Sequence, residues 1–222
     1  MAQPIYLDLN QLHEGWLATA RANCQGQLKA ATHRSVDLLS ALTLLLTTLP
    51  LLLLVALAIK LDSRGPIFYG QERIGLGGRR FIVLKFRSMR VDAEASGTPQ
   101  WASKQDPRAT RIGRFLRFSR IDEIPQVLNV LRGDMAMVGP RPERPAFVAQ
   151  LEQQIPHYKD RACVRPGITG WAQINYPYGA SVEDARHKLT YDLYYIQHRG
   201  LRLDLRILLT TIRVVLLQEG AR

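Results

Sequence analysis

Hydrophobic positions are concentrated in one run near the start of the chain. Residues 38–59 contain about a dozen leucines and no charged residue. As a helix, this run would be about 33 Å long, which is enough to cross the hydrocarbon core of a bilayer. Its leucines alone favour membrane insertion by about 6 kcal/mol. We therefore predict a membrane helix over residues 33–62, with a buried core helix of a soluble protein as the alternative.

The route of this helix is left open by two features of the sequence. Pro50 lies near the middle, where it removes a backbone hydrogen bond and bends a helix. Basic residues flank both ends, with Lys29 and Arg34 before the run and Lys60 and Arg64 after it. A spanning helix usually carries its basic excess on one side only. The two interpretations are a spanning helix and a re-entrant helix that bends at Pro50.

Shorter patterns follow the apolar run. Two β-prone stretches, 67–73 and 81–86, flank a glycine-rich turn and predict a hairpin. Residues 91–106 are polar and predict a surface loop. Residues 108–133 predict helix, broken near Pro125. The predicted fold class is therefore α+β, mostly helical, with one short β-hairpin.

The C-terminal run, 201–217, mixes arginines with leucine, isoleucine and valine. This composition predicts an amphipathic helix at the membrane interface, with its arginines toward lipid phosphates. A helix packed on the core of a soluble domain is the alternative. At the other end of the chain, no basic stretch leads directly into an apolar run, so we predict no cleavable signal peptide.

The charge of the chain indicates an anionic partner. Its 222 residues carry a net charge of +11, and the basic residues are clustered. One cluster contains Arg73, Arg79, Arg80, Lys85, Arg87 and Arg90, and a second contains Arg108, Arg111, Arg114, Arg117 and Arg120. Such clusters are typical of proteins with a polyanionic partner. The candidates are a nucleic acid, an anionic bilayer and a phosphorylated substrate.

Asp122 and Glu123 are the candidate chemical groups, since two adjacent carboxylates follow Arg117 and Arg120. A carboxylate can attack an activated phosphorus to form an acyl phosphate, and it can bind Mg²⁺. Consecutive side chains on an α-helix point about 100° apart, so both face one site only near a helix end or kink. The alternative is a solvated pair bound to the neighbouring arginines.

Arg141 is the candidate anion clamp. It lies between Pro140 and Pro142, and prolines restrict both their own backbone and that of the preceding residue. A guanidinium on a stiff backbone suits phosphate binding, although an ordinary surface arginine is the alternative. Known phosphate loops are absent from the sequence: Gly75–Gly78 lacks the spacing of a dinucleotide fingerprint, and no Walker motif occurs.

Seven ordered blocks carry a resemblance to a known family. They are residues 34–37, 63–66, 85–89, 121–126, 129–135, 138–142 and 164–175, together with the apolar segment that contains Pro50. On these blocks the chain resembles the bacterial sugar transferases, the monotopic phosphoglycosyl transferases that start glycan assembly on polyprenyl phosphate. The resemblance extends from about residue 31 to the C-terminus, and residues 176–186 resemble the branch that serves exopolysaccharide systems.

The resemblance implies a reaction. Sugar-1-phosphate passes from a UDP-sugar to undecaprenyl phosphate through a covalent aspartyl phosphosugar intermediate, and UMP is released. Asp122 matches the nucleophile and the position of Mg²⁺, and Glu123 matches its partner carboxylate. The family's basic phosphate-binding positions correspond to Lys85, Arg87, Arg117 and Arg141.

The resemblance also implies a location, with a helix bent at Pro50 and both its ends in the cytoplasm. Residues 63–222 then form a catalytic domain on the cytoplasmic face of the bacterial inner membrane, after a segment of unknown role, residues 1–32. Many related enzymes carry a large multi-span region where this chain has about thirty residues. The implied partners are the UDP-sugar, undecaprenyl phosphate and membrane lipid, with no nucleic acid, and homo-oligomers are left open.

Two other functions compete with this one. The first is a transferase that moves only the sugar and releases UDP. The second is a non-catalytic basic module, bound to the membrane, that binds anionic lipid or nucleic acid. Such a module has no need of Asp122 and Glu123, and its binding falls steeply with salt.

Overall fold

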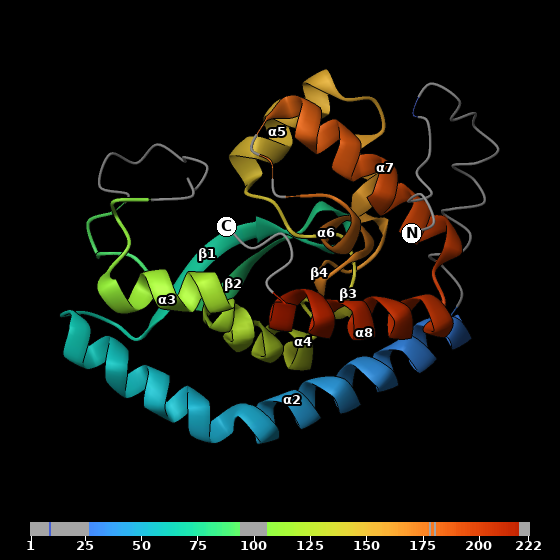
Figure 1. The fold of residues 1–222 in the computed structure, drawn as a ribbon. Helices are drawn as coiled ribbons and strands as arrows, with labels where there is room; N and C mark the ends of the chain where they lie inside the picture. The colour runs from blue at the N-terminus through green and yellow to red at the C-terminus, as the bar shows by residue number, and fades with distance from the viewer. Residues whose placement is uncertain (1–8, 10–26, 94–105, 178, 180, 218–222) are drawn as a thin grey trace.

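The computed structural model describes residues 9, 27–93, 106–177, 179 and 181–217. Within these residues the chain is mostly helical with two small two-stranded sheets, which confirms the predicted α+β class. Figure 1 shows one long helix, α2, along one side of the molecule, with the sheets and the other helices on the opposite side. Most of the predicted N-terminal segment, residues 1–32, and most of the predicted loop at 91–106 lie outside the described residues.

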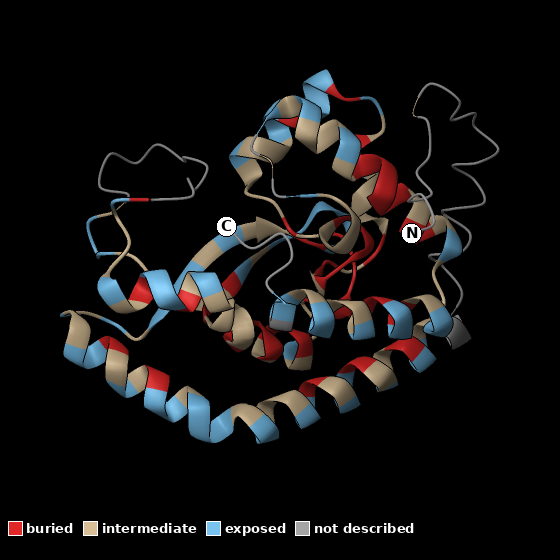
Figure 2. Ribbon diagram, viewed as in Figure 1, coloured by how far each residue is buried: buried red, intermediate tan, exposed pale blue. Residues whose placement is uncertain are grey.

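Helix α2 (Gln27–Asp62) contains the apolar run and continues through Pro50. Of the described helices, it is the one long and apolar enough to cross a membrane, over Ala30–Asp62. Many of its leucines are solvent-exposed, including Leu39 at 67% and Leu54 at 66%. Figure 2 shows exposed positions along most of α2. A helix in the core of a soluble protein would bury these side chains, so the alternative of a soluble core helix does not fit. Figure 1 shows that α2 bends near its middle.

The predicted hairpin is present. Strands β1 (Phe68–Ile74) and β2 (Arg80–Phe86) pair antiparallel, with Tyr69 opposite Lys85. The turn between them contains a short 3₁₀ helix, η2 (Leu76–Gly78), in which Gly77 and Gly78 have φ of 63° and 78°. Glycine adopts this left-handed conformation without the steric cost of a side chain. The hairpin places Lys85 next to the helices that follow.

The helix predicted for 108–133 consists of three pieces: α3 (Arg111–Ser119), the 3₁₀ helix η3 (Ile121–Gln126) and α4 (Val127–Arg132). The α-helix ends earlier than predicted, at Arg120, whose φ of 58° is left-handed. Pro125 lies inside η3 and has no N–H to donate to the carbonyl four residues earlier. The residues before it therefore form the tighter helix.

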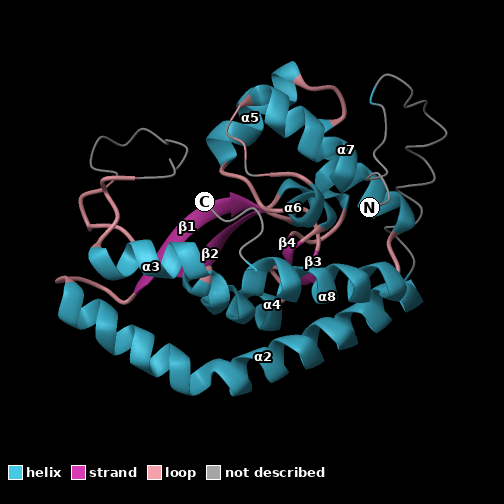
Figure 3. Cartoon of the chain, in the orientation of Figure 1, coloured by secondary structure: helices cyan, strands magenta, loops and turns pink. Residues whose placement is uncertain are grey.

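A second sheet was not predicted. Strand β3 (Ala136–Val138) pairs in parallel with β4 (Gly167–Thr169), and α5 (Pro145–Gln154) and the 3₁₀ helix η4 (Tyr158–Cys163) connect them (Figure 3). Helices α6 (Trp171–Asn175), α7 (Val182–His198) and α8 (Leu201–Leu217) complete the fold. The core includes Val127, Val130, Met135, Leu189, Leu193, Tyr195 and Ile207. Strands of three residues are too short for an alternating pattern to reveal them.

Helix α8 has features of both alternatives for the C-terminal run, because it packs on the core and also exposes apolar side chains. Ile207 is fully buried, and the hydroxyl of Thr211 lies 2.7 Å from that of Thr169 in β4. On the other side, Leu205, Leu209 and Ile212 are more than half exposed. The helix is therefore packed on the domain and also presents apolar side chains outward. Its place at a membrane interface stays a prediction.

Candidate functional site

Asp122 and Glu123 both line one cavity of about 430 Å³. They lie at the start of η3, directly after the left-handed residue Arg120 that ends α3. This break in the helix provides the irregularity that two adjacent carboxylates need to reach one site. Asp122 is 7% exposed, and the side chain of Glu123 is 15% exposed.

Glu123 is held by two cations from distant parts of the chain. Lys85 Nζ lies 2.8 Å from its Oε1, and Arg141 donates from Nη1 to Oε2 at 3.0 Å and from Nη2 to Oε1. Burial alone would raise the pKa of Glu123, but the charges of Arg141 and Lys85 outweigh burial and hold it well below the usual range. Glu123 is therefore an anion that joins β2 to the segment after β3.

Asp122 differs from Glu123 in its contacts and in the direction of its pKa shift. Among the described residues, none donates a hydrogen bond or forms an ion pair with its carboxylate. Burial, followed by the charge of Glu123, raises the pKa of Asp122 to about 6, and Lys85, Arg141 and Arg117 offset this only in part. Two adjacent carboxyl groups whose pKa values are driven apart are typical of a pair with separate chemical roles. Asp122 lines the cavity without a hydrogen-bond or ion-pair partner among the described residues, so it is the candidate for the reactive member of the pair.

Asn129 holds α4, which follows the two carboxylates, against β2, which carries Lys85. It is fully buried, its Nδ2 donates to the carbonyl of Ile82 at 2.7 Å, and its Oδ1 accepts from the amide of Leu84 at 3.0 Å. These bonds join α4 to β2 at the residue before Lys85. In the sequence, Asn129 is marked only by its place in the block 129–135.

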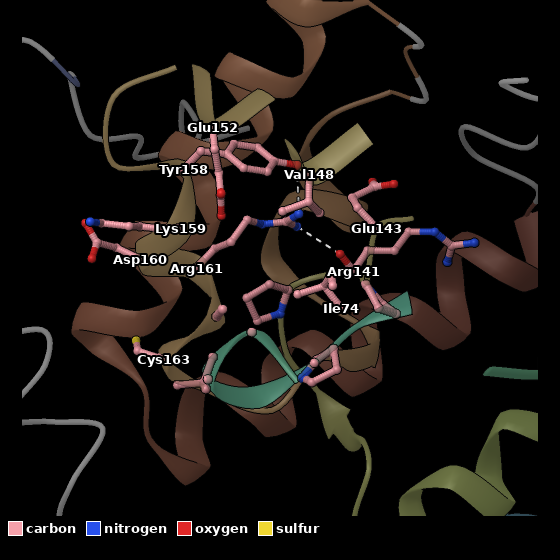
Figure 4. Close-up of a pocket in the computed structure, with 18 residues that line it drawn as sticks. Ile74, Arg141, Glu143, Val148, Glu152, Tyr158, Lys159, Asp160, Arg161 and Cys163 are labelled. Atoms are coloured by element: carbon pink, nitrogen blue, oxygen red, sulfur yellow. Dashed lines mark hydrogen bonds between the residues drawn. The ribbon is translucent and has the colours of Figure 1, made fainter. Parts of the chain in front are cut away.

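Arg161 and Asp192 hold the backbone of Arg141, and sequence reasoning missed both. Arg161 donates from Nη2 to the carbonyl of Arg141 at 2.9 Å and from Nε and Nη2 to Asp192 Oδ2 at 3.0 and 2.7 Å. Figure 4 shows the Arg161 guanidinium between Tyr158 and this carbonyl, in the wall of a second, smaller pocket. No pattern in the sequence of η4 or of α7 marks this pair. The pair keeps Arg141 on a rigid support.

Arg87 lines the cavity and also makes contacts that were not predicted. It is 5% exposed and donates to the carbonyls of Arg64 at 2.9 Å and Ser63 at 2.7 Å, in the turn directly after α2. Arg87 therefore joins the end of β2 to the turn that follows α2. A Cβ on Gly65, whose φ is 128°, would lie 2.0 Å from Arg87 Nη1, so glycine is needed there. Phosphate binding by Arg87 stays a prediction.

The cavity is strongly cationic. Its basic lining residues are Arg73, Lys85, Arg87, Arg90, Arg108, Arg117, Arg120, Arg141, Arg144, Arg161 and Lys188, against the acidic residues Asp122, Glu123, Glu143 and Asp192. The predicted Arg117 belongs to this lining, and its Nη1 lies 4.0 Å from Asp106. A concave site with such an excess of positive charge suits a substrate with several phosphate charges.

The described residues contain no group of three His, Cys, Asp or Glu side chains that could enclose a metal ion. Both oxygens of Glu123 are engaged by Lys85 and Arg141, which leaves Asp122 as the available carboxylate. Mg²⁺ is commonly bound by one or two carboxylates together with substrate phosphates and water. The residues therefore fit a magnesium ion that is shared with a phosphorylated substrate.

Comparison with known proteins gives a consistent result. Residues 28–218 match the family model described as bacterial sugar transferase. The chain is 44% identical over 214 residues to a UDP-N-acetylgalactosamine-undecaprenyl-phosphate N-acetylgalactosaminephosphotransferase of Aeromonas hydrophila, which covers 96% of this chain and 50% of that protein. It is also similar to two UDP-glucose:undecaprenyl-phosphate glucose-1-phosphate transferases. For the enzyme of Xanthomonas campestris pv. campestris, the identity is 47% over 182 residues, which cover 81% of this chain and 38% of that protein. For the enzyme of Caulobacter vibrioides, it is 45% over 190 residues, which cover 85% of this chain and 71% of that protein.

The chain thus spans half or less of the length of the first two of these relatives. The names of the three relatives share undecaprenyl phosphate, whereas the sugar differs between N-acetylgalactosamine and glucose.

Proposed function

Because the chain belongs to the bacterial sugar transferase family, we propose that it transfers sugar-1-phosphate from a UDP-sugar to undecaprenyl phosphate. The products are undecaprenyl-diphosphate-sugar and UMP, the first membrane step of an exopolysaccharide or another glycoconjugate. The observation that carries the proposal is the unpartnered carboxylate of Asp122 in a cationic cavity, beside a Glu123 already bound by Lys85 and Arg141. The names of the relatives support the acceptor and the donor class.

In the first step, an oxygen of Asp122 attacks the β-phosphorus of the UDP-sugar. The new Asp122 O–P bond forms as the bond from the β-phosphorus to the bridging oxygen breaks, and UMP leaves with the electron pair. An ionised carboxylate needs no base for this attack, and a pKa of about 6 leaves Asp122 ionised at neutral pH. Lys85, Arg117 and Arg141 stabilise the negative charge that the phosphates accumulate.

In the second step, a phosphate oxygen of undecaprenyl phosphate attacks the phosphorus held on Asp122. The carboxylate leaves and is regenerated, and the product diphosphate dissociates. Glu123 keeps Lys85 and Arg141 in place through both steps, since it binds both side chains at once. Mg²⁺, held by Asp122 and substrate phosphates, would neutralise diphosphate charge when bound.

The contacts of α2 support a re-entrant course for the membrane helix. Near its start, Arg34 donates to the carbonyls of Val130 and Leu131, and at its end Asp62 Oδ2 accepts from the amide of Ile112 at 3.3 Å. Both ends thus contact one folded domain, which favours one side of the membrane for both. The exposed leucines between them, such as Leu46 and Leu53, would lie in the lipid. We place the domain on the cytoplasmic face of the inner membrane.

Labelling with a membrane-impermeant maleimide tests this topology. Single cysteines at Ala31 and Leu61, both exposed, are introduced after Cys24 and Cys163 are replaced by serine. We expect both positions to react in inside-out vesicles and neither to react in intact cells. Reaction of the two positions from opposite faces would reject the re-entrant course in favour of a spanning helix.

Nucleotide release by the detergent-solubilised chain tests the function itself. The protein is given undecaprenyl phosphate, Mg²⁺ and one of a panel of UDP-sugars, and the nucleotide products are separated. UMP from one donor establishes the reaction and identifies the sugar. UDP would instead show transfer of the sugar alone. If no donor yields a nucleotide, the proposal fails, and salt-dependent binding of anionic lipid or nucleic acid becomes the next measurement.

Replacing Arg141 by alanine is expected to lower kcat/KM by about 10–100-fold, because a charged hydrogen bond contributes about 1.5–3 kcal/mol. The substitution removes a phosphate-binding cation and also leaves Glu123 with Lys85 alone. Arg141→Lys keeps the charge without the two-pronged contact and should give an intermediate rate. Arg80→Ala is the matched control, since that side chain is 66% exposed. Wild-type kinetics in Arg141→Ala would identify Arg141 as an ordinary surface arginine.

A further inference from the structure

Three polar side chains near the start of α2 face the folded domain. His33 and Asp37 are each 7% exposed and Arg34 is half-buried. Positions 33, 34 and 37 lie on one side of an α-helix. Burying such groups costs free energy unless they are hydrogen-bonded, so each needs a partner in the domain. We refer to His33, Arg34 and Asp37 as the α2 clamp.

Asp37 binds the strand that leads to Arg141. Its Oδ1 accepts a hydrogen bond from the backbone amide of Met137, the middle residue of β3, at 2.8 Å. On the side of β4, the amide of Ala136 in β3 donates to the carbonyl of Pro166 at 2.8 Å, and the amide of Gly139, directly after β3, donates to that of Thr169 at 2.9 Å. The strand is thus held between β4 and the membrane helix. The next residues, 139–142, are stiffened by two prolines, so a displacement of β3 is carried directly to Arg141.

Arg34 binds the helix that follows the two carboxylates. Its Nη1 and Nη2 donate to the carbonyls of Val130 and Leu131 at 2.6 and 3.0 Å, in the last turn of α4. Carbonyls at a helix end have no partner within the helix, and a guanidinium there both satisfies and locates them. Since α4 continues directly from η3, this contact fixes the helix that carries Asp122 and Glu123.

His33 adds a third attachment. Its Nδ1 lies 2.7 Å from Oδ2 of Asp204 in α8. The hydroxyl of Tyr195 in α7 lies 2.9 Å from the other oxygen of Asp204 and 3.1 Å from the carbonyl of Val138. The network from His33 therefore returns to β3, at the residue next to Met137. All three side chains of this network are at least nine-tenths buried.

We propose that the α2 clamp aligns the active site, so that the membrane helix is part of the catalytic framework as well as an anchor. Asp37 sets the position of the segment that carries Arg141, and Arg34 sets that of the segment that carries Asp122 and Glu123. These two segments meet at the Glu123–Arg141 contact. A misplacement of about 1 Å at reacting groups can cost about a hundredfold in rate. Asp37 and Arg34 are positioning residues, and the inference rests on the proposed transferase function.

The test compares substitutions at Asp37 in the full chain in detergent, with the UDP-sugar from which the wild type releases UMP. Asp37→Ala removes the acceptor for the Met137 amide and is expected to lower kcat about 10–100-fold, while KM for the donor changes less than about threefold. Asp37→Asn keeps an oxygen acceptor and should restore kcat to within about threefold of the wild type. Ser35→Ala is the matched control on the same helix, because Ser35 is exposed and its hydroxyl bonds within α2.

Hydrogen–deuterium exchange supplies the second measurement. The Met137 amide should exchange slowly in the wild type and in Asp37→Asn, and faster in Asp37→Ala. Faster exchange with wild-type kcat, or a loss confined to KM, would overturn the inference. If Asp37→Ala does not fold, Arg34→Gln is compared with Arg34→Lys. The inference then expects a lower kcat in Arg34→Gln than in Arg34→Lys, with little change in KM for either variant. Absence of UMP from the wild type would overturn the proposed function separately, before any variant is compared.

Discussion

Asp122→Asn is expected to lower UMP release at least about a thousandfold, because the amide cannot attack phosphorus to form the acyl phosphate. Donor labelled in its β-phosphate provides a direct measurement. Without undecaprenyl phosphate, the wild type should retain label on the protein, and Asp122→Asn should retain none. Asp92→Asn is the matched control, since the Asp92 side chain is 75% exposed.

The same substitution is expected to stabilise the fold. Burial and the charge of Glu123 raise the pKa of Asp122 from 3.8 to about 6, so its ionised form opposes folding. This difference corresponds to roughly 3 kcal/mol at neutral pH, at about 1.4 kcal/mol for each pH unit. An acid with a raised folded-state pKa destabilises the fold increasingly as pH rises from about 4 to 6. The gain in unfolding free energy from Asp122→Asn should therefore be larger at pH 7.5 than at pH 5.

Two outcomes would contradict these expectations. Normal UMP release by a folded Asp122→Asn protein would remove Asp122 as the nucleophile. An equal change in unfolding free energy at pH 5 and pH 7.5 would show that the carboxyl group is not buried beside a second charge. The two measurements are independent, because one follows chemistry and the other follows the free energy of unfolding.

Removal of Mg²⁺ is expected to reduce turnover by at least about a hundredfold, since a bound metal ion contributes several kcal/mol of charge stabilisation. The site supports this expectation through its chemistry. Glu123 is occupied by Lys85 and Arg141, and the remaining carboxylate, Asp122, suits an ion that is shared with substrate phosphates. UMP release is measured with excess EDTA and again after Mg²⁺ is restored.

EDTA already saturated with Mg²⁺ is the control, because it separates loss of the metal from other effects of the chelator. Full turnover in excess metal-free EDTA would remove magnesium from the mechanism. The arginines and lysine around the cavity would then have to neutralise the diphosphate alone.

The features that the sequence determined are those set by neighbouring residues. The leucines of residues 38–59 indicate a membrane helix whatever surrounds them, and the structure leaves many of them exposed. The glycine-rich turn predicts the β1–β2 hairpin, since turn and strand preferences act over a few residues. Asp122 and Glu123 stand out through an ordered set of short motifs, which requires no knowledge of their surroundings.

Tertiary packing decided what these residues can do. Lys85, Glu123 and Arg141 come from separate elements, and their meeting depends on contacts such as Asn129 to β2 and Asp37 to β3. The difference in pKa between two adjacent carboxyl groups arises from burial and from charges that folding brings near.

Arg87 shows what a motif leaves out. Its sequence block predicts a phosphate-binding residue, which stays a prediction, and the fold adds hydrogen bonds from its guanidinium to the carbonyls directly after α2. Arg161 and Asp192 carry no local signal, because a buried ion pair between distant segments leaves no pattern in either segment. Local preferences thus indicated the membrane helix, the C-terminal helix, the hairpin and the candidate residues, and long-range contacts determined the charge states and partners of those residues.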